Sequence, residues 1–297
     1  MKMYLRLFIT GLLMGSADLV PGVSGGTIAF IAGIYNQLIH SIKLVTSQVP
    51  ALLLRGKIPE AIRIVPWAFL VPLGIGIVGA VLGLSRLMEH LLDNEFVLTM
   101  AFFFGLVCAS IWIVYQRVAK WTIGAIVGLV VAAALAYWIV SLSPAETPAT
   151  PVAFFLAGAL AICAMILPGI SGSFILLIIG KYAQVLSAVN NREIVTLAIF
   201  VIGIAVGITL FSRVLSWLFD HYYNATIASL MGFMIGSLAK IWPWKETITT
   251  RINSHGIEEP LYQINIAPNE SVLLALALAI LGAAIILILN RFQLEES

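Results

Sequence analysis

The chain has 297 residues, of which 61% are hydrophobic and only 10% are charged, and its formal net charge is +2. Soluble globular proteins carry about 25% charged residues, so this composition excludes a soluble enzyme and indicates an integral membrane protein. The basic residues are scattered, which argues against a nucleic-acid partner. Cys108 and Cys163 lie far apart within apolar stretches, a pattern that argues against a disulfide or a metal site.

Long apolar segments follow one another from the start of the chain to its end. Segments such as 65–84, 121–142 and 272–289 reach or exceed the roughly 18 apolar residues that indicate a membrane-spanning helix. Their side chains are apolar on every side of the helix and do not alternate with polar ones. Helices are therefore predicted throughout.

The second half of the sequence repeats the first. Pro-Gly-Val-Ser-Gly-Gly at 21–26 aligns with Pro-Gly-Ile-Ser-Gly-Ser at 168–173, and the match continues on both sides of one length difference. Chance seldom keeps such a register, so the chain is predicted to be an internal duplication. Further matched pairs are Gly33 with Gly180, Tyr35 with Tyr182, Gln37 with Gln184, Arg86 with Arg213, and Gly105 with Gly232.

Each half begins with two short segments that meet at Pro-Gly-x-Ser-Gly, a motif that breaks a helix. The two segments either cross the membrane completely or form a re-entrant hairpin whose tip is buried at membrane depth, and we favour the hairpin. Three further segments follow in each half. Either shape gives an odd number of crossings, so the second half is expected to enter the membrane upside down.

The predicted fold is an all-α polytopic membrane protein with two inverted-topology repeats, each a re-entrant helical hairpin plus three transmembrane helices. The first repeat covers 1–143 and the second covers 144–297. In the first repeat we expect a hairpin at about 5–42, an interfacial segment at 43–63 and helices at about 65–91, 96–116 and 121–142. In the second repeat we expect a hairpin at about 152–189 and helices at about 194–219, 223–242 and 271–289.

Loop charges indicate the orientation of the chain. Lys and Arg gather on one predicted face, which identifies the cytoplasmic side and places both termini there. The connection 143–151 on the opposite face has no Lys or Arg, and acids outnumber bases in 245–270. The segment 43–63 is expected to lie along the cytoplasmic interface. The basic residues of the cytoplasmic face are Lys2, Arg6, Lys43, Arg55, Lys57, Arg63, Arg117, Lys120 and Arg291.

Ser24 and Ser171 are the central candidates for a binding site. Each follows Pro-Gly and precedes an apolar helical run, which is the position of an N-cap. Two helix N-termini that meet from opposite leaflets would form an anion site near the midplane. The alternative is that the serines only cap and the glycines only permit close packing. The other residues of this predicted substrate site are Pro21, Gly22, Gly25, Gly26, Thr27, Gly169, Gly172 and Ser173.

Four charged residues add further hypotheses. Arg86 and Arg213 match across the repeat and suit a phosphate or carboxylate if they lie inside the membrane, whereas at its surface they would only snorkel. Lys181, which faces Ile34 in the alignment, is a phosphate contact or another snorkelling side chain. Asp18 is a hypothetical site for a coupling proton or sodium ion, with local capping as the alternative.

The sequence Ser-Ala-Asp-Leu-Val-Pro-Gly-Val-Ser-Gly-Gly-Thr at 16–27, together with Leu-Pro-Gly-Ile-Ser-Gly-Ser at 167–173, resembles the bacterial PopT family over nearly the whole chain. That resemblance implies a multi-pass protein of the bacterial cytoplasmic membrane. It further implies a translocase that returns undecaprenyl phosphate from the outer to the inner leaflet for peptidoglycan and other envelope glycans. The implied partners are this lipid and the surrounding membrane lipids, with no cofactor.

Alternating access around a phosphate site is the mechanism that the resemblance implies, because inverted halves provide two related states. One alternative is an enzyme that resembles undecaprenyl-diphosphate phosphatases, which also have inverted repeats and a Pro-Gly-x-Ser loop. Their loop normally places an arginine after that serine, where this chain has Gly25 and Gly172, and no acidic pair is seen within an apolar segment. The second alternative is a transporter of a small soluble anion.

Overall fold

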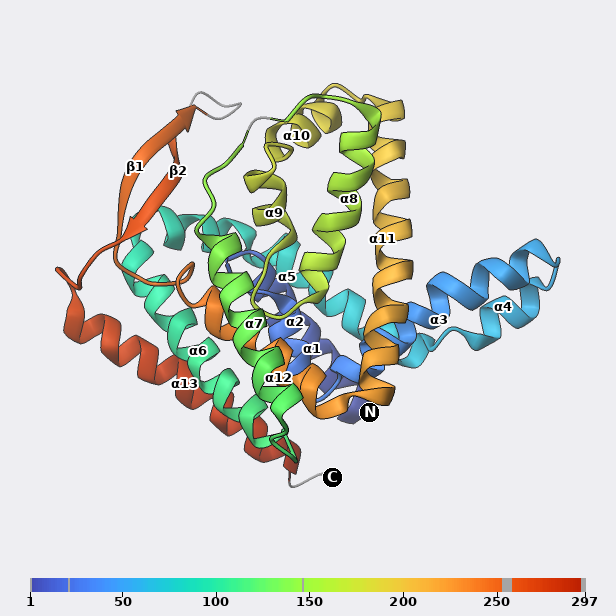
Figure 1. The fold of residues 1–297 in the computed structure, drawn as a ribbon, viewed down its shortest axis with the longest axis horizontal. Helices are drawn as coiled ribbons and strands as arrows, with labels where there is room; N and C mark the ends of the chain where they lie inside the picture. Colours follow the sequence, from blue (N-terminus) through green and yellow to red (C-terminus); the bar gives the residue numbers. More distant parts are fainter. Residues whose placement is uncertain (1, 21, 146, 253–257, 295–297) are drawn as a thin grey trace.

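A computed structural model describes residues 2–20, 22–145, 147–252 and 258–294 of the chain. Figure 1 shows a mostly helical molecule with one two-stranded sheet. The helices of the first half are α1 (Lys2–Asp18), α2 (Gly25–Ile31), α3 (Tyr35–Leu54), α4 (Ile58–Ile64), α5 (Trp67–Asn94), α6 (Phe96–Gln116) and α7 (Ile123–Val140). The second half contains α8 (Pro151–Ile166), α9 (Gly172–Ile178), α10 (Tyr182–Asn190), α11 (Ile194–His221), α12 (Tyr223–Ser237), β1 (Lys245–Ile252), β2 (Glu258–Asn265) and α13 (Val272–Leu294).

Five helices in the described part of the chain are long and apolar enough to cross a membrane, and the number rises to seven if each of two bent helix pairs counts as one span. The five are α5, α6, α7, α11 and α13. The prediction of a multi-pass helical membrane protein is therefore confirmed. The expected helix at 223–242 is shorter than predicted, because α12 ends at Ser237 and the chain then turns toward Pro243.

The second of the two segments in each predicted hairpin, which follows Pro-Gly-x-Ser-Gly, is not a single helix, and this corrects the sequence-based expectation. In the first half this segment is broken between α2 and α3 with a bend of 119°, and in the second half between α9 and α10 with a bend of 105°. Gly33 and Gly180 stand at these breaks with φ of 70° and 66°. A residue in this left-handed region ends a helix, and glycine adopts it without strain.

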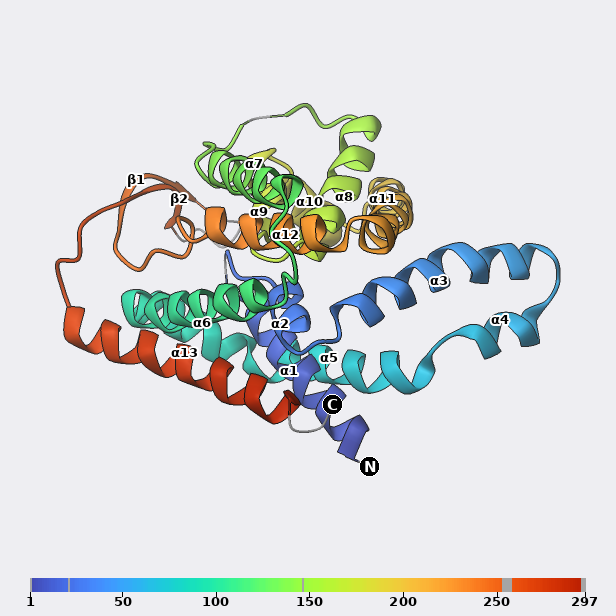
Figure 2. The same ribbon diagram turned by 60° about the horizontal axis from the view of Figure 1, so that its bottom comes forward.

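The connection 245–265 departs from the predicted all-α fold, because it contains two strands. Its strands β1 and β2 pair antiparallel, with Lys245 opposite Asn265. The segment lacks the apolar periodicity of a buried helix and carries runs of threonine and isoleucine in β1, which favour an extended chain. In Figures 1 and 2 this sheet and α10 lie on the side of the molecule opposite the two termini.

The last helix of each half packs on the other half. Within the halves α1 packs on α5 and α8 packs on α11, whereas α7 packs on α12 and α6 packs on α13 (Figures 1 and 2). Gly232 lies against the carbonyl of Leu129, and Gly236 against that of Ala133, so residue numbers rise together along both helices. Helices α7 and α12 therefore run in the same direction, and the two halves are interlocked.

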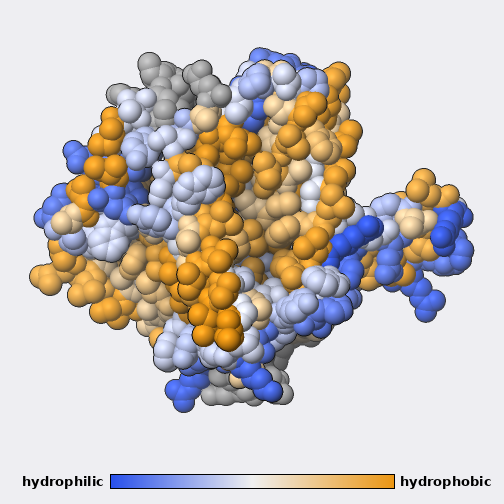
Figure 3. All heavy atoms as spheres, viewed as in Figure 1, coloured by the Kyte–Doolittle hydropathy of each residue, from blue (hydrophilic) through white to orange (hydrophobic). Residues whose placement is uncertain are grey.

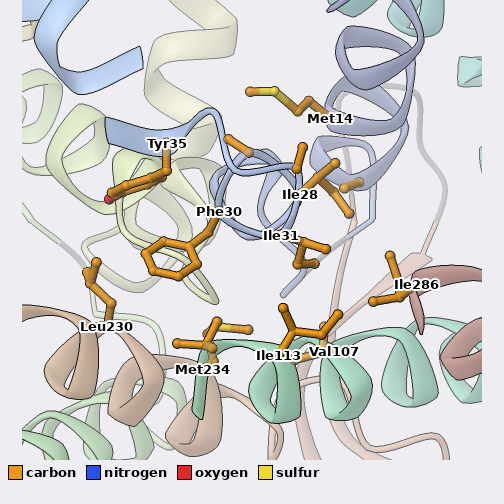
Figure 4. Packing of buried hydrophobic residues seen from close by; sticks show 14 of the residues in the cluster. Met14, Ile28, Phe30, Ile31, Tyr35, Val107, Ile113, Leu230, Met234 and Ile286 are labelled. Atoms are coloured by element: carbon orange, nitrogen blue, oxygen red, sulfur yellow. The ribbon is translucent and has the colours of Figure 1, made fainter. Parts of the chain in front are cut away.

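The short helix α2 lies at the centre of the largest apolar core. Figure 4 shows Phe30 and Ile31 of α2 facing Ile113 of α6 and Met234 of α12. All seven residues of α2 are buried. The position of the first broken helix is thus set by packing from both halves of the chain.

Large apolar side chains cover much of the outer surface, as the orange areas of Figure 3 show. Ile123, Leu82 and Leu273 expose 83%, 79% and 85% of their area. Such contiguous apolar area is costly in water and favourable against lipid tails. The outer faces of α5, α7, α11 and α13 therefore fit a lipid environment, whereas the core around α2 is closed by protein.

Replacement of Gly105 by leucine is expected to destabilise the interlock between the halves. A Cβ at Gly105 would collide with the backbone carbonyl of Ala279 in α13, and that backbone cannot move aside without a shift of the helix. We expect Gly105→Leu to cost at least about 1–3 kcal/mol and to lower the thermal unfolding midpoint in detergent. Gly83→Leu is the matched control, because nothing lies within 4 Å of a Cβ at Gly83. Equal midpoints for the two variants would contradict this packing.

Candidate functional site

The first broken-helix loop is tied to the second half of the chain through Ser24. Ser24 is the N-cap of α2 and only 1% exposed, and its Oγ accepts the N–H of Gly26 at 3.1 Å. The same hydroxyl lies 3.3 Å from the carbonyl oxygens of both Met165 and Leu167 at the end of α8. Pro21, which was also predicted to line the site, lies outside the described residues.

Asp18 occupies the N-terminus of α2. Its Oδ1 accepts the N–H of Gly25 at 2.7 Å, and a Cβ at Gly25 would come within 2.6 Å of its Oδ2. Together with Ser24, this carboxylate supplies acceptors for the first amides of the helix. The hydroxyl of Thr27, in the same first turn of α2, is buried and has no hydrogen-bond partner among the residues the structure describes. The first loop thus already holds an anion of its own.

The second loop has the same backbone shape but is left open. Gly22 and Gly169 have φ of 90° and 92° in the two loops. Ser171 is the N-cap of α9, yet no side chain caps that helix in the described structure. Its Oγ instead lies 2.8 Å from that of Ser173, which is exposed. The residue equivalent to Asp18 is Met165, so no carboxylate fills this helix end.

The two loops come together beside the end of α12. A Cβ at Gly22 would lie 2.8 Å from Cγ of Lys240, and a Cβ at Gly169 would lie 2.5 Å from Oγ of Ser237. In addition, the Tyr35 hydroxyl donates to the carbonyl of Ile166 at 3.0 Å. The structure therefore brings Ser24 and Ser171, with their flanking glycines, into one region of the protein.

The two arginines are not part of that region in this conformation. Arg213 on α11 is exposed, and its Nε donates to Ser47 Oγ of α3 at 3.0 Å. Arg86 on α5 is also exposed and forms no hydrogen bond or ion pair within the described ranges. Neither guanidinium contacts a loop, so their predicted contact with substrate stays a prediction.

Lys181 lies at the opposite end of α9 from Ser171. It is 1% exposed, and its Nζ donates to the carbonyl of Pro148 at 2.7 Å and to Gln184 Oε1 at 2.6 Å. The ammonium also lies 4.8 Å from the ring centroid of Phe154. These contacts hold the connection between the halves against α9 and α10. We therefore do not include Lys181 in the proposed phosphate site.

Two basic residues near the broken helices were missed by sequence reasoning. Arg117 donates to the carbonyls of Phe30 at 2.6 Å and Ile31 at 2.9 Å, and so caps the C-terminus of α2. Lys240 places its Nζ 4.5 Å from the ring centroid of Phe174, in the first turn of α9. A lone lysine inside the apolar run 223–242 was the signal that could have identified Lys240.

Both loops and Lys240 fall within one region of similarity to known proteins. A family model described as undecaprenyl phosphate translocase-like matches residues 14–259. This chain belongs to that family. Among the family's named relatives, a polyprenyl-phosphate transporter of Vibrio cholerae serotype O1 is 41% identical over 298 residues, which cover 97% of each chain. A polyprenyl-phosphate transporter of Staphylococcus aureus is 34% identical over 254 residues, 79% of this chain and 85% of the relative. No solved structure gives a significant match.

The two capping serines are expected to differ in their contribution to stability. Ser24→Ala removes the acceptor for the Gly26 amide and the hydroxyl that faces two carbonyls of α8, all in a buried place. We expect a loss of about 1–3 kcal/mol and a lower thermal midpoint. Ser171→Ala removes only a contact with Ser173, which can still bond to solvent, and should change the midpoint little. Equal destabilisation by both variants would contradict this asymmetry.

Proposed function

We propose that this family member is a translocase for polyprenyl phosphates, with undecaprenyl phosphate as its substrate, and that it returns this carrier from the outer to the inner leaflet of the bacterial cytoplasmic membrane. The observation that carries the proposal is the meeting of two broken-helix loops, one from each half, inside the protein. The names of the two relatives support a polyprenyl phosphate as the class of cargo. Such a carrier would supply peptidoglycan and other envelope glycan synthesis.

The chemistry of the loops fits a phosphate head group. Backbone amides and serine hydroxyls at a helix N-terminus favour a negative charge, and they act most strongly where water is excluded. Asp18 illustrates this at α2, where its carboxylate accepts the amide of Gly25. At α9, Ser171 and Ser173 leave the equivalent place without an internal anion. A phosphate can bind there while the polyprenyl tail stays in the lipid.

Two observations support inverted halves and re-entrant hairpins. Helix α2 has seven residues and is about 10 Å long, too short for a hydrocarbon layer of about 30 Å. Helices α7 and α12 run in the same direction although α12 is the counterpart of α6. If α6 and α7 are successive crossings, α6 and α12 run in opposite directions. This arrangement favours alternating access, in which the halves exchange conformations and open the loops to one leaflet at a time.

Asp18 is the proposed coupling residue. The Asp18 carboxylate accepts the Gly25 amide of the first loop, so its neutralisation by a proton or a sodium ion would weaken this bond and free the amide for a substrate anion held between the two loops. Binding of the ion by Asp18 and binding of the substrate anion are then linked, as coupling requires. We propose coupling to an ion gradient on this basis, with the proton as the simplest ion for a single carboxylate.

The proposal is tested by leaflet exchange of undecaprenyl phosphate in proteoliposomes, with release of inorganic phosphate measured in parallel. We expect exchange without phosphate release in the wild type. Ser171→Leu should reduce exchange at least about tenfold, since it fills the open helix end and removes a hydroxyl. Ser187→Leu is the control, because Ser187 is exposed on α10 and bonds only with Asn191.

Three other results would lead to different conclusions. Phosphate release from undecaprenyl diphosphate would identify the phosphatase alternative. Flux of a small anion without movement of lipid would identify the soluble-anion transporter. If well-folded Ser171→Leu exchanges the lipid at the wild-type rate, the protein is still a lipid translocase, but the second loop is not its head-group site. Reversal of an imposed pH gradient tests the direction, since proton coupling predicts that net lipid movement reverses with it.

A further inference from the structure

Two lysines project from a rigid anchor at the end of α12. Lys240 lies in the turn after this helix, and Lys245 is the first residue of β1. Between them Ile241 and Trp244 are 0% and 8% exposed. The indole of Trp244 donates to the carbonyl of Glu270 at 3.0 Å, which fixes the base of the β hairpin. Both ammonium groups therefore extend from a support that cannot rearrange easily.

Lys240 lies between the two loops. Its aliphatic chain packs on Gly22 of the first loop, and its Nζ lies over the ring of Phe174 just beyond the second. The side chain is half-buried, and within the described ranges its ammonium group has no hydrogen-bond acceptor and no carboxylate partner. A desolvated cation with only an aromatic ring beside it lacks the compensation that buried charges normally have.

Lys245 lies close enough to Lys240 for the two charges to repel each other. Its Nζ donates to Asn265 Oδ1 at 2.7 Å and to the carbonyl of Ala239 at 3.2 Å, next to Lys240 in the chain. Burial, and then repulsion by the Lys240 charge, lowers the pKa of Lys245 to about 8. Neither lysine has an ion pair with a carboxylate in the part of the chain that the structure describes. The pair is therefore an uncompensated concentration of positive charge.

We propose that Lys240 and Lys245 form a cationic site that receives the phosphate head group of the lipid on the side of the membrane opposite the chain termini. The inference rests on the proposed function and adds to it a binding site outside the two serine caps. The β hairpin that carries Lys245 lies on that side in both views (Figures 1 and 2). Since Lys240 lies between α12 and this hairpin and packs on Gly22, a phosphate bound by the pair lies next to the loops.

The charge of the pair matches a phosphate monoester better than a carboxylate. A phosphate monoester carries a charge of about −1.5 to −2 near neutral pH. Two ammonium groups neutralise this charge, whereas a carboxylate would leave one of them uncompensated. Lysine is suited to such a site because its compact charge and its three donors can follow a moving phosphate without fixed geometry. The head group then moves from the lysines to the loops, which offer hydroxyls and amides.

The first experiment measures binding of undecaprenyl phosphate to the full-length protein in detergent, by the ligand-dependent rise of the thermal midpoint. We expect Lys240→Gln and Lys245→Gln each to weaken binding by about tenfold, as loss of a charge-assisted contact predicts. Lys240→Arg should retain most of the affinity, because it keeps the charge. Lys120→Gln is the control: this lysine is exposed and lies on the side of the termini.

Two further ligands, undecaprenol and inorganic phosphate, test whether the site binds a lipid head group or free phosphate. The proposal requires that undecaprenol, which has no charge, gives the same small shift in the wild type and in both Gln variants. It also requires that inorganic phosphate stabilises the wild type far less than the lipid does. Equal protection by inorganic phosphate would overturn the lipid assignment in favour of a soluble-anion site.

A second measurement uses only the wild type and so does not depend on folded variants. Acylation of Lys245 by an amine reagent at pH 8, followed by mass spectrometry, should be slowed by undecaprenyl phosphate and not by undecaprenol. Lys120 should react at the same rate with either lipid. Unchanged acylation of Lys245 during saturating binding would overturn the proposal.

The failures of the two proposals are distinguishable. If the wild type exchanges undecaprenyl phosphate between leaflets while Lys240→Gln and Lys245→Gln bind it with unchanged affinity, the lysine site is overturned and the translocase stands. If the wild type neither binds nor exchanges this lipid, the proposed function is overturned, and the site for its head group with it.

Discussion

The hydrogen-bonded contact between the N-terminus of α2 and the C-terminus of α8 is the constraint on which the rest of the structure depends. Ser24, the N-cap of α2, places its hydroxyl against the carbonyls of Met165 and Leu167 at the end of α8, where the positive end of one helix meets the negative end of another. Tyr35, the first residue of α3, donates to the carbonyl of Ile166 beside them. These hydroxyls are buried, and a buried polar group is stable only with a hydrogen-bond partner. This requirement fixes the two halves in one register and holds their broken helices side by side.

Helices α7 and α13 each pack on a helix of the other half, and this packing stabilises the contact between α2 and α8. Since α7 packs on α12 and α13 packs on α6, neither half has a complete set of neighbours without the other. Close approach of small residues provides the packing, as Gly105 and Gly232 show at equivalent places against the backbone of α13 and α7. The pairs α1 with α5 and α8 with α11 each belong to one half, whereas α6, α7, α12 and α13 pack across the halves.

The two loops share one backbone turn but differ in chemistry. Gly22 and Gly169 give the two loops the same turn, yet Asp18 fills one helix end and Met165 leaves the other open. Lys240 aligns with Ile113 in the register that pairs Gly105 with Gly232, so it adds a cation in one half only.

The sequence by itself determined the membrane class, the duplication, the two broken-helix motifs and the N-cap positions of Ser24 and Ser171, because hydropathy, repeat register and N-cap chemistry are local properties of the chain. That the Ser171 side chain bonds to Ser173 and does not cap α9 was not predicted. The sequence also placed most helix boundaries within a few residues. It missed the breaks at Gly33 and Gly180 and the β hairpin, where tertiary packing outweighs the local pattern. Only the tertiary structure decided that α7 and α13 exchange partners, that Lys181 is held by the connection between the halves, that Arg213 bonds to α3, and that Lys240 lies between the loops. Each of these features depends on which residues, distant in the sequence, come together in the fold. The helices of this chain are similarly apolar, so their sequences carry little information about which helix packs on which.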